Sequence, residues 1–504
     1  MTVQYILAID LGTTGEKCVL YDLQGNSITE EYEEIETIYP SPGAAEIKSD
    51  DFFILACANI KKCLEKSRIN PKDIAVISID SLMGGIIGID RDFNAITYYD
   101  TAMDSRAGAE SNYIIQNFGD LVLQYCGSYS IWGHKILFWK KKNEWESIYK
   151  FVQPSTFVVA KLIGLSEKEA FIDQSFLGFS SLADLKNSQW SEELCQKLQV
   201  DVKKLPKIIK STDIVGFTSN KIKDLTGLPE GIPVCAGCGD VAAASVGAGI
   251  IKPGQMADIS GTANILSVNL DKFIYHKHFA NFKSPVDDSY YLLIAHVLGG
   301  RTLKWFADEF YAELRESIEK DGGSIYAYLD KEAEKVAPGS HGLVAIDDLQ
   351  GRFFPPDPNM RGLFIGHTWS HKKIYFYRSI LEAIAYDYYL GIGILRSQVP
   401  DMKFSDITAV GSGANSKIWL QIKADVLGIP FKTLYRSDLS SLGALVVGAV
   451  AVSLIKDVKA YLAQVLNTRS IVSPREVEFE KYKKYIEAYI DLVSNLKSYY
   501  AKLA

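Results

Sequence analysis

The sequence predicts an α/β protein built from two domains, and three observations carry this prediction. The chain has 504 residues, whereas a single domain usually takes roughly 100–200. Short apolar strands come first and alternate with helices further on, which is typical of a mixed sheet. A segment near the start, residues 8–13 (AIDLGT), is similar to one near the middle, residues 257–262 (ADISGT), as a duplicated domain would give.

The first domain begins as a β meander. Its predicted strands are residues 5–9, 17–22, 27–38 and 74–79. Gly25 supplies the turn between the second and third strands, because glycine tolerates a positive φ. Asp50 or Asp51 is expected to cap a helix that continues to residue 64.

We place the domain boundary where two glycines flank a proline, at residues 249–254. The first domain is then residues 1–249 and the second is residues 250–504. Another buried strand is expected at residues 407–410, before a glycine-rich turn in the second domain.

Composition and charge exclude several classes of protein. The net charge of −7 argues against a nucleic-acid partner. The first residues lack the basic and apolar regions of a secretory signal, and no apolar stretch approaches the ~20 residues that span a bilayer. Seven cysteines without a spacing pattern give no disulfide framework. We therefore expect a reduced, cytoplasmic protein with no membrane partner.

The first candidate for chemistry is a glycine-threonine loop after the first strand. Gly12 lets backbone N–H groups approach phosphate oxygens, and the hydroxyls of Thr13 and Thr14 add donors. Lys17 adds a positive charge, and Asp10 at the strand end can hold Mg²⁺ directly or through water. An ordinary β-turn with a structural aspartate is the alternative, because short glycine motifs often arise by chance.

The second candidate is Asp240, which opens a run of small residues at positions 241–249. Small residues allow a helix to pack tightly against a neighbour. A carboxylate at the mouth of this helix can accept a proton from a substrate hydroxyl as that hydroxyl attacks phosphorus. The alternative is that Asp240 only caps the helix, a common role of aspartate.

The third candidate is a glycine-rich turn between a buried strand and a helix, at residues 411–416. Its backbone can take a flat ring or a phosphate group. The residues assigned to nucleotide binding here are Gly411, Gly413, Ala414 and Lys417.

In this order, the three motifs resemble those of the FGGY carbohydrate kinases over nearly the whole chain. Residues 9–14 look like the first phosphate motif of that family, and Gly239-Asp240 looks like its catalytic aspartate. The other matching segments are residues 259–263 with Gly261 and Thr262 (second phosphate motif), 299–306 with Gly300 (nucleotide contact), 411–414 (adenosine motif), and 357–366 with 379–382 (C-terminal signature).

The resemblance implies two ribonuclease H-like domains of the actin type, with a nucleotide cleft between them. ATP would be held mostly by the second domain and a small sugar mostly by the first, with Mg²⁺ at Asp10 and Asp240 as the catalytic base. We also expect a homodimer. Actin-type ATPases that lack sugar kinase activity are a remote alternative, since a shared fold does not fix function.

Substrate choice depends on the residues after the strand at 74–79. Met83 and Gly84 occupy the place where glycerol kinases carry an Arg-Glu pair and where xylulokinases and gluconokinases usually carry Met-His. Gly84 would open space or pass the contact to another residue. Asp104 and Arg106 resemble the pair that lines the sugar pocket, although Met83 could fill the core and Arg106 could form a surface ion pair.

We rank D-xylulose, or a similar ketopentose, first among the substrates. Gluconate is second, because a sugar acid needs a cation, which Arg106 or His134 could supply. Val241 follows Asp240 where the family usually has Asn or Gln, and it cannot donate a hydrogen bond to a sugar hydroxyl.

Overall fold

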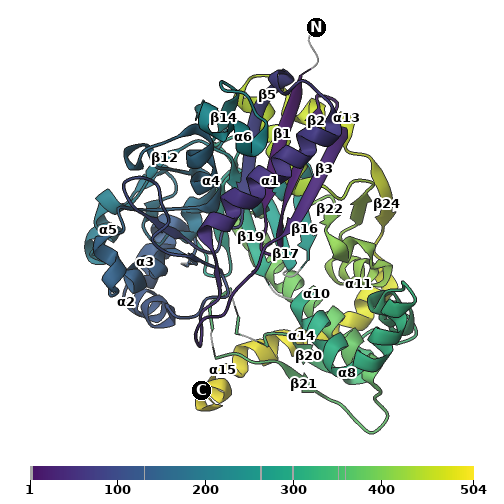
Figure 1. The fold of residues 1–504 in the computed structure, drawn as a ribbon. Coiled ribbons are helices and arrows are strands. Elements are labelled where there is room, and N and C mark those ends of the chain that lie inside the picture. Colours follow the sequence, from purple (N-terminus) through teal and green to yellow (C-terminus); the bar gives the residue numbers. More distant parts are fainter. Residues whose placement is uncertain are drawn as a thin grey trace.

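The computed structural model describes residues 4–129, 131–261, 264–297, 300–349, 351–352, 354–357 and 359–503. Two seven-stranded sheets form its framework, one from each half of the chain (Figure 1). Helices cover the sheets, as the sequence predicts for an α/β protein.

The first sheet has the strand order β13-β14-β5-β1-β2-β3, with the short β15 also paired to β5. Its strands are β1 (Tyr5–Leu11), β2 (Gly15–Asp22), β3 (Ser27–Glu34), β5 (Ile74–Ser81), β13 (Ile214–Phe217), β14 (Pro233–Cys235) and β15 (Cys238–Gly239). The meander β1-β2-β3 is antiparallel, whereas β1, β14 and β15 each run parallel to β5. Parallel neighbours end at the same edge of the sheet, which brings the ends of β1, β5 and β15 together.

The second sheet has the order β18-β19-β17-β16-β22-β23-β24. Its strands are β16 (Met256–Ser260), β17 (Asn264–Leu270), β18 (Ala280–Lys283), β19 (Tyr291–Val297), β22 (Ile407–Val410), β23 (Phe431–Leu434) and β24 (Thr468–Val472). The strand β16 is antiparallel to β17 and parallel to β22, just as β1 is antiparallel to β2 and parallel to β5. The sequence similarity between residues 8–13 and 257–262 thus falls on the equivalent strands of a repeated topology.

The remaining elements pack around these sheets. The helices are α1 (Ser49–Ser67), α2 (Gly108–Cys126), α3 (Gly133–Trp139), α4 (Pro154–Ile163), α5 (Glu192–Lys197), α6 (Lys223–Thr226), α7 (Asp240–Gly247), α8 (Gly300–Lys320), α9 (Ile325–Ala333), α10 (Lys373–Gln398), α11 (Lys417–Leu427), α12 (Leu439–Ala451), α13 (Val458–Val465), α14 (Glu476–Asn495) and α15 (Lys497–Leu503). Two-stranded sheets are formed by β4 (Glu46–Ile47) with β7 (Tyr99–Asp100), β6 (Ile87–Ile89) with β8 (Lys150–Val152), β9 (Phe171–Asp173) with β12 (Lys207–Ile209), β10 (Ala183–Asp184) with β11 (Gln189–Trp190), and β20 (Val344–Ile346) with β21 (Leu363–Ile365).

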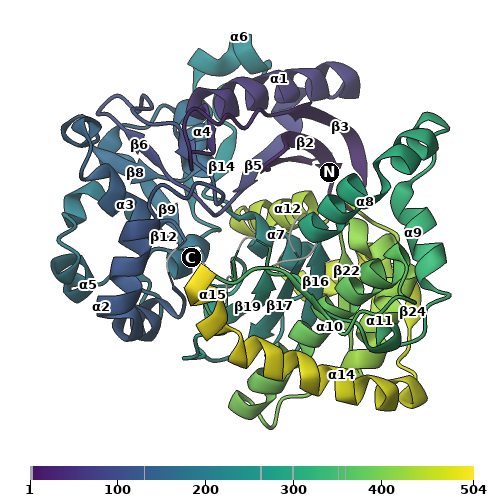
Figure 2. The same ribbon diagram turned by 90° about the horizontal axis from the view of Figure 1, so that it is seen from below.

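The helices α7 and α12 join the two halves at the centre of the molecule (Figure 2). They approach closely because glycine faces backbone at two points. A Cβ on Gly443 would clash with the carbonyl of Ala243, and a Cβ on Gly247 would clash with that of Leu439. The small residues after Asp240 therefore have the packing role that the sequence predicts.

Two local predictions need correction, and one is confirmed. The third strand ends at Glu34, four residues before the predicted end. The helix α1 begins at Ser49, so Asp50 and Asp51 lie in its first turn, where their charges favour the positive end of the helix dipole, rather than at its cap. Gly25 has the expected positive φ of 77°.

Within the described ranges, no helix has both the length and the apolar character needed to cross a membrane. All seven cysteines are buried and none forms a disulfide.

Candidate active site

Three carboxyl groups meet where parallel strands of the first sheet end. Asp10 lies near the end of β1 and pairs in register with Asp80 near the end of β5. Cys238 of β15 also pairs with Asp80, and Asp240 follows two residues later. Asp80 is fully buried, whereas Asp10 and Asp240 keep some solvent-accessible surface.

Burial and repulsion between the carboxyl groups raise the pKa values of Asp80 and Asp240. Burial, followed by the charge of Asp10, raises the pKa of Asp240 to about 7. Burial and the charges of Asp10 and Asp240 raise the pKa of Asp80 well above its usual range. Neither oxygen of the Asp80 carboxyl receives a hydrogen bond from another described side chain or backbone group. Burial also raises the pKa of Asp10, and its interactions with the Asp80 side chain and the charge of Lys17 offset part of this rise.

Asp240 is the first residue of α7, and Gly239 is the cap. The interpretation of Asp240 as an N-cap is therefore wrong. Its Oδ1 accepts the N–H of Val241 at 2.8 Å, which fixes the carboxyl direction at the start of the helix.

The loop between β1 and β2 follows Asp10 directly. Its backbone is closed by a hydrogen bond from the Gly12 N–H to the carbonyl of Gly15 at 3.0 Å. Thr13 and Thr14 are exposed, so their hydroxyls are open to a ligand. Lys17 lies opposite Asp10 in the strand register, but its Nζ is 2.8 Å from Glu30 Oε2. This cation is therefore shared with an exposed carboxylate.

The second sheet gathers its glycine loops in the same way. Gly261 follows β16, Gly300 begins α8 after β19, and Gly411 follows β22. Because β19, β16 and β22 run in one direction, these three loops lie at one edge of the sheet. Thr262, the partner of Gly261 in the predicted phosphate motif, lies outside the described residues.

The Gly411 loop rests on Ser260. Gly411 has a φ of 82°, and a Cβ there would clash with the Ser260 carbonyl. A Cβ on Gly413 would clash with the Ser260 side chain. Ala414 is partly buried, and Lys417 is the exposed first residue of α11.

A buried ion pair lies beneath Ser260. The Nζ of Lys423 is 2.6 Å from Asp258 Oδ2 and donates to the Ser260 hydroxyl at 3.1 Å. That hydroxyl donates in turn to Asp258 Oδ1 at 2.6 Å. Both charged side chains are almost completely buried. The pair therefore fixes the residue on which the Gly411 loop rests.

Met83 and Gly84 lie near Gly239, the residue before Asp240. Met83 is buried, as its interpretation as a core residue requires, and it packs so closely on Gly239 that a Cβ there would clash with its sulfur. Gly84 does not open space, because a Cβ there would clash with that of Ala102. Ala102 therefore occupies the space that a side chain at position 84 would need.

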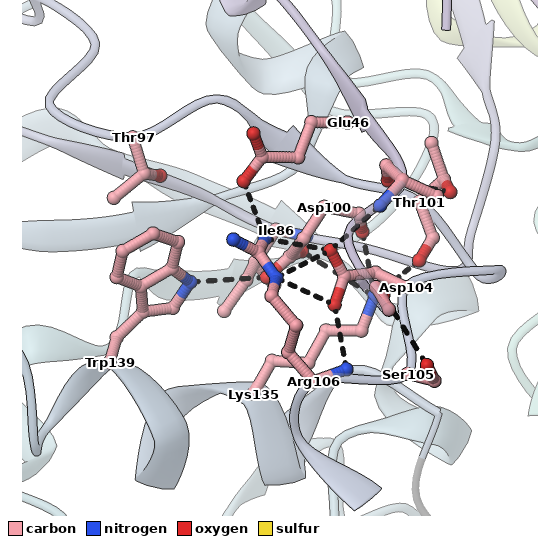
Figure 3. A network of polar contacts seen from close by, with 12 residues as sticks. Glu46, Ile86, Thr97, Asp100, Thr101, Asp104, Ser105, Arg106, Lys135 and Trp139 are labelled. Atoms are coloured by element: carbon pink, nitrogen blue, oxygen red, sulfur yellow. Dashed lines mark hydrogen bonds and ion pairs between the residues drawn. The ribbon is translucent and has the colours of Figure 1, made fainter. Parts of the chain in front are cut away.

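Asp104 and Arg106 belong to a polar network (Figure 3). The guanidinium of Arg106 pairs with both Asp104 and Glu46. Asp104 also accepts the N–H of Ala45 at 3.1 Å. Arg106 lines a cavity of about 710 Å³ with Glu46, Tyr98, Phe138 and Trp139, and neither Asp10 nor Asp240 lines this cavity.

Lys135 connects the network to the Met83-Gly84 segment. Its buried Nζ donates to the carbonyls of Gly84, Asp100 and Thr101 at 2.9, 2.7 and 2.6 Å. The Asp100 carboxyl, 3.5 Å from that Nζ, accepts the indole N–H of Trp139 at 3.1 Å. One cation therefore fixes the backbone of two segments.

Comparison with known proteins identifies the family of the chain. The family model for the N-terminal domain of the FGGY family of carbohydrate kinases matches residues 5–247, and the model for the C-terminal domain matches residues 259–452. The chain belongs to the FGGY family of carbohydrate kinases. Kinases of this family use ATP, and the two α/β domains described above are its ribonuclease H-like fold.

Relatives of this kinase act on different sugars. It is 25% identical to a xylulose kinase of Staphylococcus epidermidis, over 100% of this chain and 99% of that protein. It is 26% identical to a gluconokinase of Bacillus subtilis, over 99% and 98% of the two chains. The crystal structure of a ligand-bound xylulose kinase from Lactobacillus acidophilus superposes with a TM-score of 0.88 at 22% identity, over 99% of this chain and all of that one.

The structure of the kinase adds residues that sequence reasoning missed. Asp80 directly follows the predicted strand at residues 74–79, and only the parallel register places it beside Asp10. Lys135 and Lys423 are buried cations, and a lysine among apolar residues of a helix was the available signal for each. Among the described residues, no group of three or more His, Cys, Asp or Glu side chains is arranged to hold a metal ion by itself.

Proposed function

We propose that this kinase transfers the γ-phosphoryl group of ATP to a hydroxyl of a neutral ketopentose, with D-xylulose as the first candidate. The observation that carries the proposal is Asp240, a carboxyl at the start of α7 whose pKa is about 7 and which lies near the charge of Asp10. The exposed residues Thr13 and Thr14 follow Asp10 in the adjoining loop. A base with a pKa near the working pH is suited to take a proton from an alcohol.

In the proposed reaction, Asp240 accepts the hydroxyl proton while the sugar oxygen attacks the γ-phosphorus and ADP leaves. The backbone N–H groups and hydroxyls of residues 12–14 would hold the transferred phosphoryl group. The loops at Gly261, Gly300 and Gly411 would hold the remainder of the nucleotide, with Ser260 fixing the last of them.

Asp10 is the residue proposed to hold Mg²⁺, which would neutralise phosphate charge when bound. The local chemistry fits such an ion, since Asp240 adds like charge beside Asp10 and the Asp80 oxygens receive no hydrogen bond from other described groups. One or two protein carboxylates suffice for Mg²⁺, because phosphate oxygens and water complete its shell.

The charges around the Met83-Gly84 segment favour a neutral sugar. Arg106 is paired with two carboxylates, and Lys135 is bound to three carbonyls. Burial, followed by the charge of Lys135, lowers the pKa of His134 to about 3, so its imidazole is neutral at pH 7. None of these three side chains offers a spare positive charge to a sugar carboxylate. We infer that Asp104 and Arg106 act on the sugar indirectly, by fixing the backbone around Thr101.

Gluconate is the second candidate, because a gluconokinase relative is as similar to the chain as the xylulose kinase is. A panel of pentuloses, hexuloses, polyols and aldonates, scored by ADP release, separates the two. We expect the highest kcat/KM for a pentulose and at least a tenfold lower value for gluconate. A preference for gluconate would contradict the charge argument while leaving the family assignment intact.

The domain boundary at residues 249–250, the homodimer and the cytoplasmic location stay predictions. Size-exclusion chromatography with light scattering tests the homodimer.

A further inference from the structure

The turn that leads into Asp240 is anchored from outside its own strand. The N–H of Gly239 donates to the hydroxyl of Ser175 at 2.9 Å. The N–H of Gly237 donates to the carbonyl of Ser211 at 3.1 Å. Two residues from distant parts of the chain therefore hold the backbone on either side of Cys238, directly before Asp240.

Asp173 ties these two anchors together. Its Oδ1 accepts the N–H of Ser175 at 2.9 Å and the hydroxyl of Ser211 at 2.8 Å. All three side chains, here called the Asp173 cluster (Asp173, Ser175 and Ser211), are buried. Buried hydrogen bonds to a carboxylate are strong and directional, so this cluster defines the position of the turn.

Pairing within the sheet gives the turn only short support. The strand β15 is two residues long, and its described strand partner is β5. Gly237 has a φ of 78° and lies so close to Ile79 that a Cβ would clash with the Ile79 carbonyl. Neither glycine has a side chain with which to anchor itself.

We propose that Asp173 and Ser175 are positioning residues for phosphoryl transfer, which hold Asp240 where it can reach the substrate hydroxyl. The inference rests on the proposed role of Asp240 as base. It assigns no substrate contact to the Asp173 cluster, which acts through the backbone of residues 237–239.

The test compares Ser175→Ala with a matched control, Thr218→Ala. The Thr218 hydroxyl accepts the N–H of Ile232 at 2.9 Å in a buried turn of the same domain. Both changes remove a buried hydroxyl acceptor from a backbone amide, but only Ser175 touches the turn before Asp240. Asp173→Asn is a second variant that keeps the side-chain size.

We expect Ser175→Ala to lower kcat by roughly 10²-fold, the effect of a misplacement of about 1 Å. The KM for ATP should stay within twofold, because the described hydrogen bonds of the cluster involve only residues of the first domain. Thr218→Ala should lower the thermal midpoint about as much as Ser175→Ala does, but it should keep the wild-type kcat. Ser175→Thr restores an acceptor and should recover much of the activity, and Asp173→Asn should resemble Ser175→Ala.

The double variant Ser175→Ala/Asp240→Asn shows whether Ser175 acts through Asp240. If it does, the double variant is no slower than Asp240→Asn alone, because residues that act as a unit are not additive. Equal kcat for Ser175→Ala and Thr218→Ala, or fully additive losses in the double variant, would overturn the inference. Full turnover by Asp240→Asn would instead overturn the proposed base, so the two failures are distinguishable.

Discussion

Replacing Asp240 by asparagine should stop the reaction and stabilise the protein at the same time. The substitution keeps the shape of the side chain and an oxygen that can accept the Val241 N–H. It removes the group proposed to take the hydroxyl proton, so kcat should fall by roughly 10²–10⁴-fold. It also removes a carboxyl that the folded protein holds in a poorly solvated place beside Asp10.

The stability effect follows from the pKa. Folding raises the pKa of Asp240 from 3.8 to about 7. A rise of about three units, at about 1.4 kcal/mol each, corresponds to at most about 4 kcal/mol in the free energy of unfolding. This cost is absent below pH 3.8, grows between pH 3.8 and 7, and is complete above pH 7. Asparagine cannot ionise, so the variant should be more stable than the wild type at pH 8. The difference in stability should be smaller at pH 5.

Urea unfolding of both proteins at pH 5 and pH 8 measures this difference. Asp308→Asn is a control of opposite sign, because the hydrogen bond from Lys304 lowers the pKa of Asp308. The stability due to Asp308 is present above the unfolded pKa and is lost as the pH falls through the lower folded value. A stability difference for Asp240→Asn that is the same at both pH values would refute the electrostatic account of the site.

Three further predictions concern the metal, the nucleotide loops and domain motion. Asp10→Asn should require more Mg²⁺ for half-maximal activity while the sugar KM is unchanged. If the variant and the wild type gave the same activity across a Mg²⁺ titration, Asp10 would be purely structural. Lys423→Met should destabilise the protein by roughly 3–5 kcal/mol, because Asp258 is left buried without its partner. It should also raise the KM for ATP. Calorimetry measures the stability and steady-state kinetics the KM, and the double variant Lys423→Met/Asp258→Asn should recover part of the stability. Sugar and a non-hydrolysable ATP analogue together should reduce the radius of gyration in small-angle scattering by a hinge near residues 249–254, more than either ligand alone, since each ligand shifts the balance only by its preference for the closed form; an unchanged radius with both bound would argue for a rigid site.

The local features of this fold could be predicted from the sequence because short segments encode them. Gly25 marks a hairpin, Gly12 follows an apolar strand, and small residues after Asp240 form a tightly packed helix. Each of these depends on the conformational preference of a few neighbouring residues. The family resemblance then supplied the order of the motifs and the fold that joins them.

The electrostatic features could not be predicted in this way, because they join residues far apart in sequence. The assignment of Arg106 to the sugar pocket stays a prediction, whereas its pairing with Glu46, which is 60 positions away, emerges only from the fold. Asp80 acquires a role only through its register with Asp10, and the partner of Lys423 lies 165 positions away in Asp258. Sequence indicates which charges exist, whereas only the fold indicates which of them are neutralised.

In the proposed reaction, the repeated topology explains why the base lies in only one half of the molecule. When the Gly12 and Gly261 loops are aligned, Asp10 of β1 corresponds to Ile259 of β16. The first sheet therefore keeps acids at its strand ends. Burial raises the pKa of all three, and neighbouring carboxyl charges add to the rise for Asp80 and Asp240. In the second sheet the acid is one position earlier, at Asp258, where Lys423 neutralises it beneath the loops. An edge whose Asp258 is paired with Lys423 suits the polyanionic nucleotide, and an edge with a base whose pKa is about 7 suits the alcohol. Two copies of one fold can thus divide a phosphoryl transfer between them through the placement of a few carboxyl groups.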